Sequence, residues 1–150
     1  MPTEQDVPLG RNTDSLRSIS PNSFQLLPLW LTVGWGLIAL IVYLSLTASP
    51  PEVFEFAFAD KLKHLFAYSV LMGWFTQLYP SLKARGVWAL ALFFLGVTVE
   101  FIQGWSGYRF FDVADMVANS FGVLLGWWLS TRWLAGSLLR VDGVLSRWLR

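Results

Sequence analysis

The chain has 150 residues, of which 55% are hydrophobic and only 14% are charged, whereas an ordinary soluble domain carries about 25% charged residues. Because a chain of this length must cover much surface, its shortage of charge argues against a soluble monomer and against a disordered chain. The net charge of +1 and the absence of cysteine argue against a nucleic-acid partner, disulfides and thiolate metal sites.

The N-terminal residues 1–26 are polar and rich in proline, serine and asparagine, which predicts a flexible cytoplasmic tail. The apolar run Leu29–Thr47 follows, and it is long enough to span a bilayer. Pro50 and Pro51 mark the end of this first helix, because proline does not continue a helix.

Three further membrane helices are predicted along the chain. The second covers Asp60–Tyr79, and a link over 81–86 separates it from the apolar run Val87–Val99 of the third. A polar loop over 104–109 leads to the fourth helix, Phe111–Trp133. Each run is apolar over most of its length, as a transmembrane helix requires.

Residues 134–150 have a different pattern. Apolar residues recur there at a spacing of three or four, and arginines occupy the other faces. This pattern predicts an amphipathic helix lying in the membrane interface, and a frayed basic tail is the alternative. The predicted fold class is therefore all-α, with a four-helix transmembrane bundle over 27–133 and an interfacial C-terminal helix.

The basic residues predict the orientation of this bundle. Lys61, Lys63 and Arg109 fall on one side of the membrane, and the other eight lysines and arginines fall on the opposite side. Because positive charge stays in the cytoplasm, both termini and the link between helices two and three are expected there. The sequence thus predicts a multi-pass protein of the plasma (inner) membrane.

Polar residues on three of the four helices fall at one depth. With a rise of about 1.5 Å per residue from the cytoplasmic helix ends, His64, Glu100, Asp115 and Asn119 lie about 20–25 Å up. That is the outer part of a hydrocarbon core about 30 Å thick, where ionisable groups are candidates for a functional site. Asp60 and Asp112 lie about one turn higher.

Helical spacing also places polar residues on shared faces, because residues three or four apart are neighbours on a helix. Gly122 and Gly126 continue one of these faces and would allow another helix to approach closely. The three faces are Asp60, His64 and Tyr68; Glu100 and Gln103; and Asp112, Asp115 and Asn119.

These three polar segments resemble the signature of VanZ-like membrane proteins. The resemblance covers residues 60–126 and rests on Asp60-Lys61-x-x-His64-x-x-x-Tyr68, Glu100-x-x-Gln103 and Arg109-x-x-Asp112-x-x-Asp115-x-x-x-Asn119-x-x-Gly122. Leu65 departs from the pattern, since an aromatic residue is common after the histidine. The family is named for a protein that contributes to teicoplanin resistance, and the resemblance implies a small polytopic membrane protein of the cell envelope. It implies no established reaction.

The residues themselves suggest both chemistry and structure. His64 is a candidate general base that Asp60 would orient, or else a histidine that bridges helices by hydrogen bonds. Glu100 is a candidate general acid or base, or else the partner of Arg109 or a lysine in an ion pair. Asp115 completes the catalytic candidates. The candidate binding residues are Lys61, Tyr68, Gln103, Arg109, Asp112 and Asn119, with Arg109 and Lys61 as contacts for an anion.

The leading functional hypothesis is an outward-facing polar pocket that handles an envelope lipid or a lipid-linked precursor, either as a hydrolase or as a transferase. The alternative is a non-catalytic membrane protein whose polar layer is structural and which alters envelope access or binds a partner. A transporter ranks third, because no helix is visibly broken at the midplane. The expected partners are membrane lipids. No cofactor and no metal is expected, because the basic neighbours compete for the carboxylates that would bind a cation.

Overall fold

The computed structural model describes residues 21–47, 58–107 and 110–150. Over these residues the chain forms five α-helices, one short 3-10 helix and no strand, which confirms the all-α prediction. The elements are η1 (Pro21–Ser23), α2 (Leu27–Leu46), α3 (Ala59–Leu78), α4 (Leu82–Trp105), α5 (Val113–Arg132) and α6 (Ser137–Trp148).

Helices α2 and α4 are the two described helices that are long and apolar enough to cross a membrane. Most of their residues are not buried within the protein, so large apolar side chains such as Trp35, Leu40 and Phe94 face outward. Helices α3 and α5 are 20 residues long each, but both are charged near their start: α3 carries Asp60, Lys61 and Lys63 there, and α5 carries Asp115.

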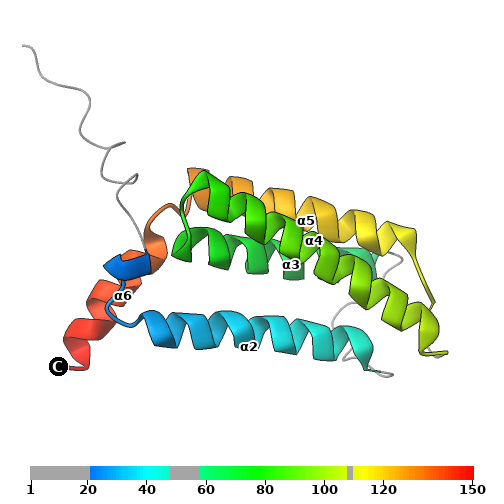
Figure 1. Cartoon of the computed structure of the whole chain (residues 1–150), viewed down its shortest axis with the longest axis horizontal. Coiled ribbons are helices and arrows are strands. Elements are labelled where there is room, and N and C mark those ends of the chain that lie inside the picture. The colour runs from blue at the N-terminus through cyan, green and yellow to red at the C-terminus, as the bar shows by residue number, and fades with distance from the viewer. Residues whose placement is uncertain (1–20, 48–57, 108–109) are drawn as a thin grey trace, which may run out of the picture.

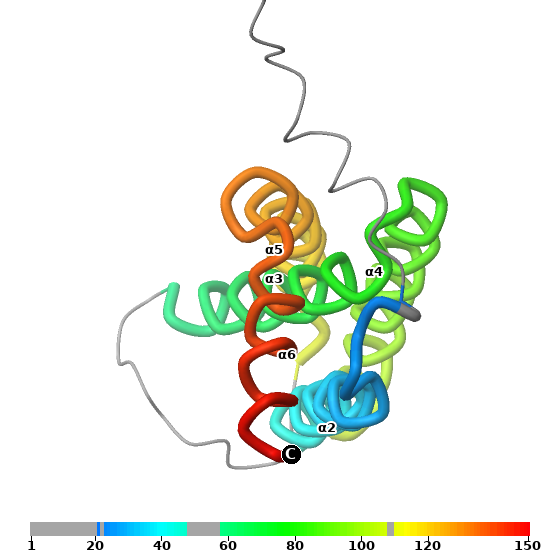
Figure 2. The backbone as a smooth tube through the Cα atoms, turned by 90° about the vertical axis from the view of Figure 1, so that its left-hand side faces the viewer, coloured from blue at the N-terminus to red at the C-terminus, as the bar shows by residue number. Residues whose placement is uncertain are grey.

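Helix α3 is the central element of the bundle. Figures 1 and 2 show α2, α4 and α5 arranged around it, with successive helices running in opposite directions. Its side chains at Leu71, Met72, Phe75 and Leu78 are fully buried. The ring of Phe75 stacks on Trp88 of α4 with a centroid separation of 3.7 Å, so aromatic packing joins α3 to α4.

Helices α3 and α5 pack most closely, and two glycines permit this contact. A Cβ atom on Gly122 would lie 2.4 Å from the backbone oxygen of Leu65, and one on Gly126 would lie 2.2 Å from that of Ser69. No side chain fits at such distances. The sequence-based expectation that these glycines admit another helix is therefore confirmed.

Helix α4 is longer than the sequence suggested. Residues 82–86 of the predicted link and residues 104–105 of the predicted loop belong to the helix, which runs from Leu82 to Trp105. The hydroxyl of Ser81 accepts a hydrogen bond from the backbone N–H of Ala84 at 3.2 Å and so caps the helix start. Lysine and arginine are good helix formers. The polar residues before Val87 therefore marked where the apolar segment begins, whereas the helix itself begins at Leu82.

Helix α6 confirms a helical segment within 134–150 and lies across the end of the bundle where α2 begins (Figure 2). Its buried face carries Leu138, Asp142 and Ser146, whereas Val141 and Trp148 are 51% and 87% exposed. The predicted apolar stripe is thus divided between the bundle and the exterior. Its location in a membrane interface remains a prediction.

The last residues of the predicted flexible tail belong to the folded structure. Pro21–Ser23 forms η1, and Phe24 is buried in the same apolar group as Trp30 and Leu138. The backbone N–H groups of Gln25 and Leu26 donate hydrogen bonds to Asp142 of α6. The tail boundary predicted at residue 26 is therefore too late along the chain, because α6 provides partners that the local sequence does not reveal.

Candidate functional site

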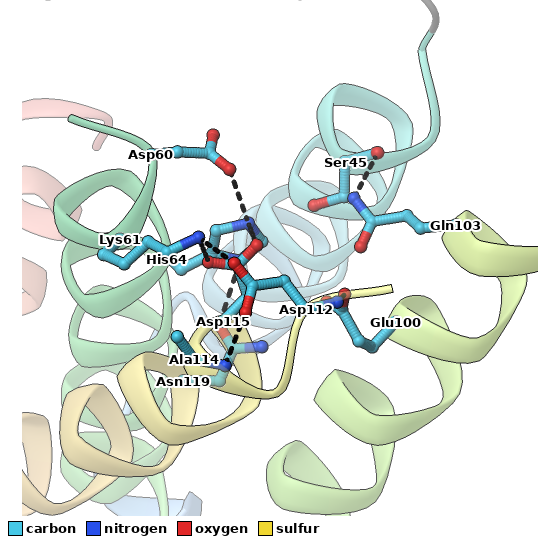
Figure 3. Close-up of polar contacts among 10 residues, drawn as sticks. All are labelled: Ser45, Asp60, Lys61, His64, Glu100, Gln103, Asp112, Ala114, Asp115 and Asn119. Carbon is cyan, nitrogen blue, oxygen red and sulfur yellow. Dashed lines mark hydrogen bonds and ion pairs between the residues drawn. The ribbon is translucent and has the colours of Figure 1, made fainter. Parts of the chain in front are cut away.

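Polar side chains gather where α3 and α5 begin and α4 ends (Figure 3), and this end of the bundle lies opposite α6 (Figure 1). The antiparallel order of the helices brings these three segments together, as the depth estimate predicted. We call this group the polar cluster, and it consists of Asp60, Lys61, His64, Glu100, Asp112, Asp115 and Asn119.

His64 lies at the centre of the polar cluster and is buried. Its Nδ1 atom is 3.1 Å from Oδ1 of Asn119. Its Nε2 atom is 3.7 Å from Oδ2 of Asp115 and 3.9 Å from Oδ2 of Asp60. The hydrogen bond that orients the ring therefore comes from Asn119 on α5, whereas the sequence pointed to Asp60 on the same helix.

Lys61 joins α3 to the start of α5. Its Nζ atom contacts Oδ2 of Asp112 and lies 2.8 Å from Oδ1 of Asp115. The Lys61 ammonium holds the pKa of Asp112 below its usual range, and the hydrogen bond from the backbone N–H of Ala114 acts in the same direction. Lys61 is thus paired with carboxylates in this structure, whereas the sequence suggested a contact with an anionic ligand.

Glu100 ties α4 to the loop before α5. Its Oε1 atom accepts a hydrogen bond from the backbone N–H of Asp112. The residue is only 1% exposed, and its Oε2 atom is buried with no hydrogen-bond partner among the described residues. Arg109, the ion-pair partner that the sequence offered, lies outside the described residues, so its role in binding stays a prediction.

Gln103 and Tyr68 occupy the edges of this region. The Nε2 atom of Gln103 donates to the backbone oxygen of Ser45 at 2.8 Å, so this side chain joins α4 to the end of α2 (Figure 3). Tyr68 is buried one turn below His64 on α3. The sequence placed both residues at the site, and the structure gives Gln103 a contact with α2 instead.

Gly96 is a site residue that the sequence reasoning missed. A Cβ atom there would lie 3.0 Å from Nδ2 of Asn119 and 3.3 Å from the hydroxyl oxygen of Tyr68. The absence of a side chain therefore lets α4 approach the residue that orients His64. A glycine within an apolar helix, one turn before Glu100, was the available signal.

Three members of the polar cluster present metal-binding atoms to one another. Asp60, His64 and Asp115 each offer one donor atom, and the three atoms lie within 4.8 Å of one another. The same arrangement also allows proton transfer, because a buried imidazole faces two carboxylates. Both kinds of chemistry use the Nε2 atom of His64.

Comparison with known proteins agrees with the motif resemblance and extends it. A family model described as VanZ/LLP1 matches residues 7–135. The match spans α2 to α5 and is wider than residues 60–126, which carry the motif resemblance. Neither a curated protein nor a solved structure matches the chain. Because the family model covers most of the sequence and the polar cluster unites its motif residues, the chain belongs to the VanZ/LLP1 family.

Proposed function

We propose that this protein is an integral membrane protein of the cell envelope whose polar cluster handles an envelope lipid or a lipid-linked precursor. The observation that carries the proposal is the burial of three ionisable side chains, His64, Glu100 and Asp115, from three different helices at one end of the bundle. Burying ionisable groups is costly, so a cluster of them in a membrane protein favours a functional role. Family membership and the two apolar helices α2 and α4 support the membrane setting.

The proposal includes a four-span topology in which α3 and α5 also cross the membrane. Their 20-residue length is sufficient for a span, and their charged first turns lie at the end of the bundle. The opposite end carries many basic residues, which favours a cytoplasmic location for that end and for both termini. The polar cluster then faces outward from the inner membrane. The basic residues at the cytoplasmic end include Lys83, Arg85, Arg132, Arg140, Arg147 and Arg150.

In the catalytic form of the proposal, the protein is a hydrolase or a transferase. Nε2 of His64 accepts the proton of the attacking water or hydroxyl, and the carboxylates of Asp60 and Asp115 stabilise the resulting imidazolium. Glu100 supplies a proton to the leaving group. Arg109 holds an anionic headgroup, and Lys61 does so once it leaves Asp112.

A second candidate is a non-catalytic protein whose polar cluster holds the helices together and which alters envelope access or binds a partner. The observation that favours it is the mutual pairing of the cluster, since Lys61 pairs with Asp112 and Asp115, and His64 with Asn119. In this case removal of a polar group would lower stability without a specific effect on lipids.

Lipid mass spectrometry of cells with and without the protein tests the proposal. We expect one class of envelope lipid or lipid-linked precursor to change in abundance when the protein is absent, and to recover when the wild-type chain is restored. Susceptibility to teicoplanin, measured in the same strains, tests the link to glycopeptide resistance that the family suggests. An unchanged lipid profile would contradict lipid handling and favour the structural candidate.

A further inference from the structure

We propose that Asp60, His64 and Asp115 bind a divalent transition-metal ion of the zinc or manganese class. The sequence argued against a metal because basic neighbours would compete for the carboxylates. In the structure the basic neighbour Lys61 contacts Oδ1 of Asp115, whereas Oδ2 of the same carboxylate faces His64, and the placement of the donor atoms in the polar cluster gives positive support (Figure 3).

The donor atoms have the types and spacing that such an ion requires. Nε2 of His64 lies 3.7 Å from Oδ2 of Asp115 and 3.9 Å from Oδ2 of Asp60. Ligands bonded at about 2.1 Å around a tetrahedral ion are separated by roughly 3.4 Å. Small rotations of the two carboxylates are therefore sufficient to close the site. One imidazole nitrogen with two carboxylate oxygens suits Zn²⁺ or Mn²⁺.

The tautomer of His64 supplies an independent argument. Oδ1 of Asn119 is a carbonyl oxygen and only accepts hydrogen bonds, so Nδ1 of His64 must donate in this contact. In a neutral imidazole the lone pair is then on Nε2. That lone pair faces two carboxylate oxygens at 3.7 and 3.9 Å, which are beyond hydrogen-bonding distance. A cation among the three atoms would turn this repulsive arrangement into an attractive one.

Lys61 does not occupy the atoms that the metal would need. Its Nζ atom is 2.8 Å from Oδ1 of Asp115, whereas His64 faces Oδ2 of the same carboxylate. Its other carboxylate contact is with Asp112, which is not among the three donors. Lys61 thus orients Asp115 and leaves the second oxygen directed at His64.

Charge and access also favour a cation at this position. Asp60, Glu100, Asp112 and Asp115 bring four carboxyl groups together, and Oε2 of the buried Glu100 has no hydrogen-bond partner among the described residues. The Asp60 side chain is 46% exposed, so water reaches this donor from outside the bundle, whereas the side chains of His64 and Asp115 are only 8% exposed. Three protein ligands with one open side are typical of catalytic metal sites, where water or substrate completes the coordination.

Asn119 would act as the positioning residue of this site. Metal-bound histidines almost always donate their other ring N–H to an oxygen acceptor, and Asn119 provides that acceptor here. Metal binding itself does not depend on the proposed function, and only the chemical role of the bound ion rests on it. Within that proposal the ion would polarise a phosphate or carbonyl oxygen of the lipid, or activate a water molecule, and His64 would be a ligand instead of the base.

Metal binding is measurable on the purified full chain in detergent, in the absence of any lipid substrate. The chain has a single histidine, so the purification tag must contain none. We expect one Zn²⁺ or Mn²⁺ ion to bind per chain when either metal is titrated by calorimetry after treatment with a chelator. We also expect the ¹⁵N resonance of His64 Nε2, the only imidazole signal apart from Nδ1, to shift when Zn²⁺ is added.

Variants locate the binding site. His64→Ala should abolish binding, and Asp60→Asn should weaken it by about tenfold or more, because the variant loses a charged ligand. The Asp60 side chain is 46% exposed, so this variant keeps the fold. Asp142→Asn removes the same charge at the opposite end of the bundle and should bind as the wild type does. Absence of binding to the wild-type chain, or equal binding by the wild type and Asp60→Asn, would overturn the inference.

The outcomes separate this inference from the proposed function. If metal binds but the lipid profile of cells does not depend on the protein, the metal site stands and lipid handling fails. If the lipid profile depends on His64 but no metal binds, the metal site fails, and His64 acts as the base of the proposed reaction.

Discussion

Asp142 is a buried carboxylate that fixes α6 to the start of α2. It accepts hydrogen bonds from the backbone N–H groups of Gln25 and Leu26 at 2.8 and 2.9 Å, and from Nε1 of Trp30 at 2.7 Å. Burial alone would raise its pKa, but these three donors outweigh burial and hold the pKa below its usual range. The N-terminal end of α2 also favours a negative charge at this position.

Asp142→Asn should therefore loosen the attachment of α6. The amide loses the charge and one acceptor, so we expect a loss of about 1–3 kcal/mol in the free energy of unfolding. Arg140→Gln, which changes an exposed charge on the same helix, is the control and should have little effect. Denaturant unfolding in detergent measures both variants, and wild-type stability of Asp142→Asn would contradict the role assigned to this carboxylate.

The pH dependence of the wild type follows from the lowered pKa. The unfolded chain has an aspartate pKa of about 3.9, so the stabilisation by Asp142 is fully present above that pH. It is lost as the pH falls through the lower folded-state pKa. The difference in stability between the wild type and Asp142→Asn should therefore shrink below about pH 4.

For single residues, the sequence predicted which polar side chains lie close together better than it predicted the hydrogen-bond partner of each. Helical spacing selected His64, Asp115 and Asn119, because neighbours on one helix follow from its period. It pointed to Asp60 as the group that orients His64, whereas Asn119 holds Nδ1. Partners on different helices depend on how each helix is rotated about its axis, and the spacing within one helix does not report that rotation.

Among the elements, the close contact between α3 and α5 positions the polar cluster. Gly122 and Gly126 allow the two backbones to approach, and this approach places Asp115 and Asn119 of α5 against His64 of α3. The packing of one helix pair thus determines the geometry of the site about one to three turns away.

Gly126→Ala should disturb this pair. Its Cβ atom would lie 2.2 Å from the backbone oxygen of Ser69, so the helices must move apart. We expect a loss of about 1–3 kcal/mol in the free energy of unfolding, as for other overpacked cores. Gly36→Ala on α2 is the matched control, because beyond its own stretch of helix no described atom lies within 4 Å of its Cβ position. It should be neutral or more stable by up to about 1 kcal/mol. Equal unfolding midpoints for the two variants would contradict the close packing.

The sequence predicted the helices themselves but not all of their ends. Apolar length revealed the four central helices, yet Lys83 and Arg85 suggested a link where α4 has already begun. In α6 the spacing of apolar residues predicted a helix. It did not predict that Asp142 on the buried face accepts a hydrogen bond from Trp30 of α2. Long-range contacts of this kind leave no periodic signal in the local sequence.

For the whole molecule, the main feature is the contrast between its two ends. The polar cluster lies at one end, and α6 lies across the other, near the starts of α2 and α4 (Figure 1). The basic residues of α6 and of the first turn of α4 add positive charge to that end. This asymmetry is the basis for expecting the α6 end in the cytoplasm.

Single cysteines test this orientation directly, because the natural chain contains none. Asn12→Cys, Ser81→Cys and Ser106→Cys are introduced one at a time and exposed to an impermeant thiol reagent outside intact cells. We expect Ser106→Cys alone to react, since Ser106 follows α4 at the polar-cluster end. Labelling of all three after the cells are opened is the control. Reaction of Ser81→Cys in intact cells would reverse the orientation.

The central claim is that the polar cluster is a functional site and not only a contact between helices. The most direct test compares His64→Gln and Asp115→Asn with the wild type in cells that lack the protein, by lipid mass spectrometry and by melting of each purified chain. Both variants keep hydrogen-bonding groups of similar size, and intramembrane side-chain hydrogen bonds contribute about 0.6 kcal/mol on average. We expect both variants to melt close to the wild type and to fail to restore the lipid profile. A restored lipid profile in both variants, with lowered melting temperatures, would contradict the claim.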